Sequence, residues 1–110
     1  MERELSDAVE AARLAARIHR RFREEGFVPL ARSDPTDRVT PADIEAEQAI
    51  REFLTSRYPD HAILGEEAGE TGSSSRRWIV DPLDGTVNYA ARFPFYGASI
   101  ALEVDGEIQL

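Results

Sequence analysis

Two acidic residues, Asp81 and Asp84, stand three positions apart directly after an apolar run at residues 78–80. The run has no polar alternation, which is typical of a strand buried on both faces. Pro82 has no N–H to donate to a β-ladder, so we expect the strand to stop near Asp81. Both carboxylates are therefore predicted at the carboxyl end of a buried strand, where open α/β sheets bind their ligands.

A Gly85-Thr86 step follows the second carboxylate and predicts the start of a short helix that ends near residue 91. Asp84 belongs to the residue types that cap helix N-termini, so we expect it to be the N-cap of this helix. The N–H groups at a helix start attract anions. Carboxylates that hold a hard cation, next to amides that hold a phosphate, make a metal-dependent phosphate site, which is our working hypothesis.

A third candidate ligand is Glu66, which follows a short apolar strand predicted at residues 62–64. Neighbouring side chains of a strand point to opposite faces, so at most one of Glu66 and Glu67 is expected to face the site. Oxygen donors alone select magnesium, manganese or calcium over zinc or copper, and few protein ligands with open positions favour magnesium. Two such ions could activate a water and neutralise the leaving oxygen of an in-line displacement.

Some of these acids also have an explanation that needs no ligand. N-capping alone would account for Asp84, and a capping box with Thr40 would account for Asp43 at the start of the second helix. Asp81 is harder to explain in this way. A carboxylate at a buried strand end costs several kcal/mol unless it is paired or bound to a metal.

Two long helices are expected to support the site. Acids near the start of Glu2–Glu25 and arginines near its end suit the helix dipole, and Gly26 is placed to end it. Thr40 and Pro41 are typical of a helix start, and the second helix should run to about Arg57. Further expected features are a mobile loop at residues 69–77, a strand at 96–104, a hairpin turn at 105–106 and a return strand at 107–110.

The composition limits the class of protein. The 110 residues carry a net charge of −8, which disfavours nucleic acid, because phosphates need a basic partner surface. There are no cysteines, which excludes disulfides, thiolate metal sites and cysteine nucleophiles. No stretch approaches the roughly 20 apolar residues that span a bilayer, and no secretory signal follows Met1. We expect a soluble cytoplasmic protein without nucleic-acid or membrane partners.

Several stretches resemble the inositol monophosphatase family, a branch of the magnesium-dependent, lithium-sensitive phosphatases that also include fructose-bisphosphatases. Residues 65–67, Gly-Glu-Glu, resemble the first metal motif of the family. Residues 78–88 resemble its signature, Asp-Pro-hydrophobic-Asp-Gly-Thr followed by Asn, and residues 39–43, 93–95 and 99–102 match its flanking stretches. The resemblance covers nearly the whole chain, from the first helix onward.

The resemblance implies an α+β fold, the layered α-β-α-β-α sandwich of fructose-bisphosphatase-like sugar phosphatases. Family members are much longer, and their second half supplies a further metal-binding aspartate and most substrate-selecting residues. We therefore expect residues 1–110 to be the N-terminal α+β portion of this fold, with the C-terminal half absent. It would consist of two long helices packed on a largely antiparallel sheet, and would have little or no activity alone.

The resemblance also assigns metal ligands by position. Glu66, Asp81 and the main-chain carbonyl of Leu83 would bind a first magnesium, and Asp81 and Asp84 would bind a second. Manganese is implied as a substitute for magnesium, and lithium as an inhibitor. Arg32 stands where the family often carries a lysine, so properties that depend on that lysine are not carried over.

The same resemblance assigns catalysis to Glu66, Thr86 and Asp43, and substrate or phosphate binding to Asp84, Gly85 and Thr86. The amides of Gly85 and Thr86 would hold the phosphate. Thr86, hydrogen-bonded to Asp43, would orient the attacking water together with Glu66. Asp84 would also touch a hydroxyl of the substrate.

These roles predict a magnesium-dependent phosphomonoesterase that hydrolyses a small polyol phosphate, with myo-inositol monophosphate as the first choice. Histidinol phosphate, fructose bisphosphate and a phosphoadenosine nucleotide are the related alternatives, and a homodimer is expected for the full-length enzyme. An aspartyl-phosphate mechanism is a competing hypothesis, although its Asp-x-Asp spacing differs from that of Asp81 and Asp84. The other is an inactive fragment that binds divalent cations or dimerises.

Overall fold

Two long helices and a five-stranded sheet form most of the structure, a computed structural model that describes residues 1–28, 30–31 and 38–110. Arg32 lies outside these residues. No helix among them is both long and apolar enough to cross a membrane. The elements in chain order are α1 (Glu2–Glu25), β1 (Leu30–Ala31), β2 (Arg38–Val39), α2 (Pro41–Arg57), β3 (Ala62–Gly65), β4 (Gly69–Thr71), β5 (Arg76–Asp84), α3 (Thr86–Ala90), β6 (Gly97–Val104) and β7 (Glu107–Ile108).

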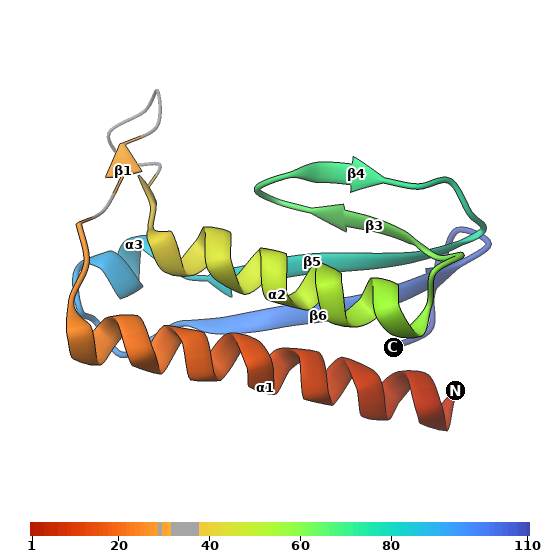
Figure 1. Cartoon of the computed structure of the whole chain (residues 1–110), viewed down its shortest axis with the longest axis horizontal. Coiled ribbons are helices and arrows are strands. Elements are labelled where there is room, and N and C mark those ends of the chain that lie inside the picture. The colour runs from red at the N-terminus through yellow and green to blue at the C-terminus, as the bar shows by residue number, and fades with distance from the viewer. Residues whose placement is uncertain (29, 32–37) are drawn as a thin grey trace.

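Both predicted long helices are confirmed. α1 ends at Gly26, which has a φ of 87° and donates its N–H to the Phe22 carbonyl at 2.8 Å. α2 begins with a complete capping box: the Thr40 hydroxyl accepts from the Asp43 N–H, and the Asp43 carboxylate accepts from the Thr40 N–H. The two helices lie side by side and run in opposite directions (Figure 1).

The main sheet has the strand order β4-β3-β5-β6-β7. β3 and β5 pair in parallel, and the other three pairings are antiparallel, so the predicted largely antiparallel sheet is confirmed. The parallel pair matters for the site. Because β3 and β5 are neighbours that run in the same direction, their carboxyl ends lie at the same edge of the sheet. Glu66 follows the end of β3, and Asp81 lies near the end of β5.

The core lies between the two helices and one face of the sheet. Along β5, Trp78 and Val80 are 0% and 3% exposed, whereas Ile79 between them is only half-buried. The prediction of a strand buried on both faces is therefore wrong for the described residues, because α1 and α2 pack on the same face. The other buried residues of this core are Ala8, Ala11, Ala15, Ala46, Ile50, Leu54, Tyr58, Ile63 and Leu102.

β5 does not stop near Asp81 but continues to Asp84. Its register with β6 shifts between these two residues, so Pro82 lies at a bulge, where the ladder requires no N–H from it. The N-cap of α3 is Gly85, with a φ of 85°, and the predicted cap by Asp84 is wrong. Asp84 is an exposed residue at the end of the strand, and helix capping does not explain its carboxylate.

The remaining strands form hairpins. Asp105 and Gly106 have positive φ angles of 51° and 83°, the backbone pattern of a tight hairpin turn, so the predicted turn is confirmed and β7 follows it. The loop predicted at residues 69–77 is partly wrong. It contains β4, which pairs with β3, and the start of β5. All three residues of β4 are exposed, so no apolar alternation marks this strand in the sequence.

Candidate metal and phosphate site

A pocket of about 250 Å³ opens where the β3–β4 turn, the end of β5 and the start of α3 meet. Six of the predicted site residues border this one space, and the seventh, Asp43, contacts it through Thr86. The structure thus brings together residues that are far apart in the sequence. The lining residues are Glu66, Asp81, Leu83, Asp84, Gly85, Thr86, Val87 and Asn88.

Asp81 and Leu83 border the pocket at the β5 bulge. Asp81 is half-buried, and its Oδ1 accepts a hydrogen bond from the Leu83 N–H at 3.3 Å. This bond from the same strand orients the carboxylate. In the part of the chain that the structure describes, the Asp81 side chain makes no other hydrogen bond, so its Oδ2 can still accept a ligand.

Thr86 joins the pocket to α2. Its hydroxyl lies 2.8 Å from Asp43 Oδ1 and 2.9 Å from the Leu83 carbonyl oxygen. A hydroxyl has one proton, so it donates to one of these acceptors at a time. Asp43 is 1% exposed and is held by its capping box. The predicted bond between Thr86 and Asp43 is therefore present, and capping and contact with the site are compatible roles of one carboxylate.

Gly85 gives the chain the sharp bend between β5 and α3. Its φ of 85° is in the left-handed region, and a Cβ there would lie 2.8 Å from the Phe95 carbonyl oxygen. The Tyr89 N–H donates to the Gly85 carbonyl at 2.9 Å, and the N–H groups before it have no acceptor within the helix. Because α3 has only five residues, individual N–H groups rather than a long helix dipole would attract an anion here.

Glu66 and Glu67 face different spaces, as predicted. Glu66 lines the pocket with the two aspartates, whereas Glu67 lines a separate cavity against α2. Both lie in the turn between β3 and β4 and not in a strand. The expectation that only one of the two glutamates faces the site therefore holds, although it was based on the alternation of side chains in a strand and these residues lie in a turn.

The donors around the pocket suit a hard cation. They are the carboxylates of Glu66, Asp81 and Asp84 and main-chain or side-chain oxygens, with no histidine or cysteine among the lining residues. Within the described residues, no group of three or more His, Cys, Asp or Glu side chains is close enough to hold a metal ion. Magnesium commonly uses one or two carboxylates and keeps several waters, so this donor set fits magnesium better than a metal that needs a complete protein cage.

His19 of α1 supports the same strand end, which the sequence pattern did not indicate. It is 3% exposed, and its Nε2 lies 2.8 Å from the Pro82 carbonyl oxygen. Burial lowers the pKa of His19, which favours the neutral ring with Nε2–H as the donor. The Tyr89 hydroxyl of α3 in turn donates to the His19 carbonyl at 2.5 Å. α1 therefore holds β5 and α3 on either side of the pocket.

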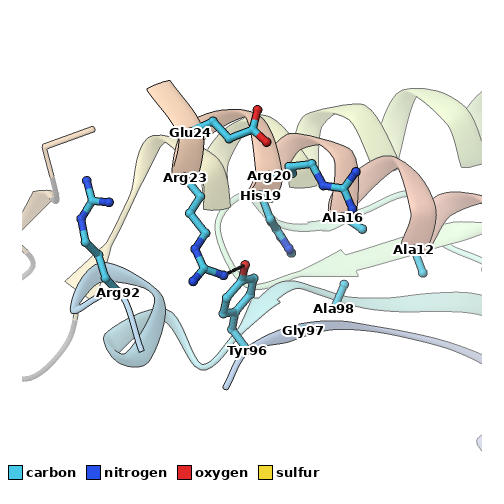
Figure 2. Close-up of a pocket in the computed structure, with 10 residues that line it drawn as sticks. All are labelled: Ala12, Ala16, His19, Arg20, Arg23, Glu24, Arg92, Tyr96, Gly97 and Ala98. Atoms are coloured by element: carbon cyan, nitrogen blue, oxygen red, sulfur yellow. Dashed lines mark hydrogen bonds between the residues drawn. The ribbon is translucent and has the colours of Figure 1, made fainter. Parts of the chain in front are cut away.

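A larger cavity of about 670 Å³ lies between the C-terminal half of α1 and the start of β6 (Figure 2). Its charged lining residues are Arg20, Arg23, Arg92 and one acid, Glu24, and Arg23 donates to the Tyr96 hydroxyl at 3.0 Å. The excess of positive charge makes this cavity unsuitable for a cation. The smaller pocket, where acidic residues from the ends of β3 and β5 meet, suits a cation better and is the candidate metal site.

This chain matches known sequences of the inositol monophosphatase family. The model of the inositol monophosphatase family matches residues 1–110. An inositol-1-monophosphatase of Caulobacter vibrioides is 44% identical over 102 residues, which are 90% of this chain and 40% of the relative. A histidinol-phosphatase of Chlorobaculum parvum is 48% identical over 73 residues, which are 66% of this chain and 28% of the relative.

Comparison with solved structures confirms the predicted fold class. The extragenic suppressor protein suhB from Bartonella henselae matches with a TM-score of 0.88 and 38% identity, over 94% of this chain and 42% of that protein. The chain therefore spans less than half the length of each of these three proteins.

Proposed function

Because this chain belongs to the inositol monophosphatase family, we propose that its pocket serves the magnesium-dependent hydrolysis of a small polyol phosphate. One observation carries the proposal. Three acidic residues, Glu66, Asp81 and Asp84, come from two separate strand ends and line one space beside the first residues of α3. Such an arrangement places cation ligands next to main-chain donors for a phosphate.

Glu66, Asp81 and the Leu83 carbonyl would hold one magnesium, and Asp81 and Asp84 would hold a second. The chemistry that magnesium supplies when bound is the activation of a water and the neutralisation of the leaving oxygen. Manganese is the expected substitute. Asp81 is the ligand common to both positions, and its hydrogen bond from the Leu83 N–H holds it in place.

The other groups would bind and orient the reactants. The N–H groups of Gly85 and Thr86 would hold the phosphate oxygens. When the Thr86 hydroxyl donates its hydrogen bond to Asp43, the lone pairs of the hydroxyl oxygen can accept a hydrogen bond from the attacking water. With Glu66 as a second acceptor, this would direct the water oxygen at phosphorus. Asp84 is exposed at the pocket and would accept from a hydroxyl of the substrate.

Myo-inositol monophosphate is the proposed substrate. The Caulobacter relative named for inositol-1-phosphate chemistry matches 90% of this chain, against 66% for the histidinol-phosphatase. Histidinol phosphate is the second candidate because that shorter match has the higher identity, 48% against 44%.

The test combines binding and turnover. Calorimetry would measure binding of myo-inositol 1-phosphate and of histidinol phosphate to the wild type, Asp81→Asn and Asp60→Asn, each with and without magnesium. Asp60 is an exposed acid in the turn after α2 and controls for lost charge. We expect myo-inositol 1-phosphate to bind the wild type and Asp60→Asn only when magnesium is present, and not to bind Asp81→Asn. Turnover by the chain alone should release phosphate slowly, if at all.

Other results would point elsewhere. Ester binding that is insensitive to magnesium and to Asp81→Asn would refute the proposal. Cation binding without any effect on the ester would favour a cation-binding fragment. A phosphate trapped covalently on Asp81 would favour the aspartyl-phosphate mechanism instead.

A further inference from the structure

A residue of α2 anchors the turn that carries Glu66. The Glu47 carboxylate accepts two main-chain hydrogen bonds from this turn, from the Glu67 N–H to Oε1 at 2.8 Å and from the Ala68 N–H to Oε2 at 2.7 Å. Bonds to an ionised acceptor are stronger than those between neutral groups. The first of these N–H groups belongs to the peptide that joins Glu66 to Glu67. The contact therefore orients the main chain of Glu66 directly.

Glu47 is itself held in one position. It is 1% exposed, and the Nε of Arg51, one turn later on α2, lies 3.2 Å from Oε2. Arg51 also donates to the Gly69 carbonyl and, at 3.0 Å, to the Thr71 hydroxyl, both in β4. A buried carboxylate costs free energy that an apolar side chain would not. Here that cost is offset by the hydrogen bonds that the ion pair makes to the β3–β4 turn and to β4. These bonds indicate that the ion pair stabilises the position of this turn.

The end of β3 rests against the same carboxylate. A Cβ on Gly65 would lie 2.5 Å from the Cδ and Oε1 of Glu47 and 2.8 Å from Nη2 of Arg51. Gly65 is also the register partner of Val80, the residue before Asp81. Two contacts therefore fix where the turn lies relative to Asp81: the β3–β5 ladder and the Glu47 carboxylate.

We propose that Glu47 is a positioning residue for the metal ligand Glu66. It holds the β3–β4 turn so that the Glu66 carboxylate faces the pocket shared with Asp81. Without the anchor, the two turn N–H groups would bond to water, and Glu66 would take up several orientations. The cost of ordering it would then reduce the affinity for a cation. The inference rests on the proposed function, since it assumes that Glu66 binds a metal.

The test measures Mn²⁺ binding to the full chain by calorimetry for the wild type, Glu47→Gln, Gly65→Ala and Glu52→Gln. Glutamine keeps the size of the side chain but has one acceptor oxygen, so one turn N–H loses its partner. Gly65→Ala displaces the carboxylate from the other side. Glu52 is an exposed acid on the same helix and controls for lost charge. Loss of a residue that orients a metal ligand should weaken Mn²⁺ binding by about 10–100-fold in Glu47→Gln and Gly65→Ala, and Glu52→Gln should bind as the wild type does.

Thermal unfolding would establish that each variant is folded at the titration temperature, and amide hydrogen exchange would report on the turn itself. Unchanged Mn²⁺ affinity in folded Glu47→Gln overturns the inference. An equal loss in Glu52→Gln also does, because net charge would then explain it. If the wild type binds no Mn²⁺, the proposed function fails and exchange decides the positioning role. Faster exchange at Glu67 and Ala68 with a shifted Glu66 resonance in Glu47→Gln would support it, and wild-type behaviour would overturn it.

Discussion

Replacement of Asp43 tests whether one carboxylate supports both the helix cap and the site. Asp43 is 1% exposed and accepts three hydrogen bonds, from the Thr40 N–H and hydroxyl at 2.7 Å each and from the Thr86 hydroxyl at 2.8 Å. At about 1–1.5 kcal/mol for each bond, Asp43→Ala should lower the free energy of unfolding by about 3–4.5 kcal/mol. Small domains have about 5–15 kcal/mol in total, so the variant should still fold.

Asparagine at the same position makes a sharper comparison. Its oxygen can keep both bonds from Thr40, which end on one carboxylate oxygen, Oδ2. Its NH₂ group can donate to the Thr86 hydroxyl. That hydroxyl can then donate to the Leu83 carbonyl oxygen, which lies 2.9 Å from it in the unmutated structure. All three contacts survive with a neutral acceptor, so Asp43→Asn should cost about 1 kcal/mol. The Thr86 hydroxyl would, however, be turned away from the orientation proposed for catalysis.

Urea unfolding followed by circular dichroism measures both variants, with Asp60→Ala as a control at an exposed acid. The expected order of stability is Asp60→Ala, then Asp43→Asn, then Asp43→Ala. Equal stability of the two Asp43 variants, or a loss in Asp43→Ala below about 1 kcal/mol, would refute the account of this carboxylate.

Three further predictions concern the framework. Leu54 is 0% exposed in the core, so Leu54→Ala should cost about 2–5 kcal/mol in chemical unfolding, and a loss typical of a surface site would contradict the described packing. Gly85→Ala places a Cβ on a residue with a φ of 85°, 2.8 Å from the Phe95 carbonyl oxygen. The backbone strain alone costs about 1–2 kcal/mol, and the clash adds to it, so the loss in the free energy of unfolding should be larger than that; a smaller loss would contradict the described bend. Burial, above all, raises the pKa of Tyr58 and of Tyr89 to about 12. The unfolded chain loses these protons near pH 10 while the folded chain keeps them, so stability should fall from about pH 10 to about pH 12; ultraviolet titration in which both phenols ionise near pH 10 would contradict this.

The sequence was most informative where local chemistry decides the structure. Thr40 and Asp43 form the capping box that their spacing predicts, and Gly26 ends α1. These features depend on residues a few positions apart, so a single sequence contains the whole signal. Glu66 and Asp81 were also expected in one site, because each follows an apolar run and both match motifs of the family. The parallel pairing of β3 with β5, which brings them to one sheet edge, was not predicted.

The errors arose where a distant contact overrides a local rule. Pro82 would end a regular strand, yet the β5 bulge accommodates it. Asp84 has the side chain of an N-cap, but the left-handed backbone of Gly85 takes that position. Glu47 accepts hydrogen bonds from main-chain N–H groups 20 and 21 residues away. A side chain that bonds to a distant main chain has no recognisable sequence motif. The available signal was the position of the acidic Glu47 on α2, directly after Ala46 and three residues before Ile50, both of which are buried.

The central claim is that carboxylates from the ends of β3 and β5 bind the same divalent cation. Titration of the isotope-labelled chain with magnesium, followed by NMR, tests it most directly. We predict that the resonances of Glu66 and Asp81 shift together with one apparent affinity, and that phosphate added afterwards shifts the amides of Gly85 and Thr86. Shifts at Asp81 without any at Glu66, or two unrelated affinities, would contradict the claim.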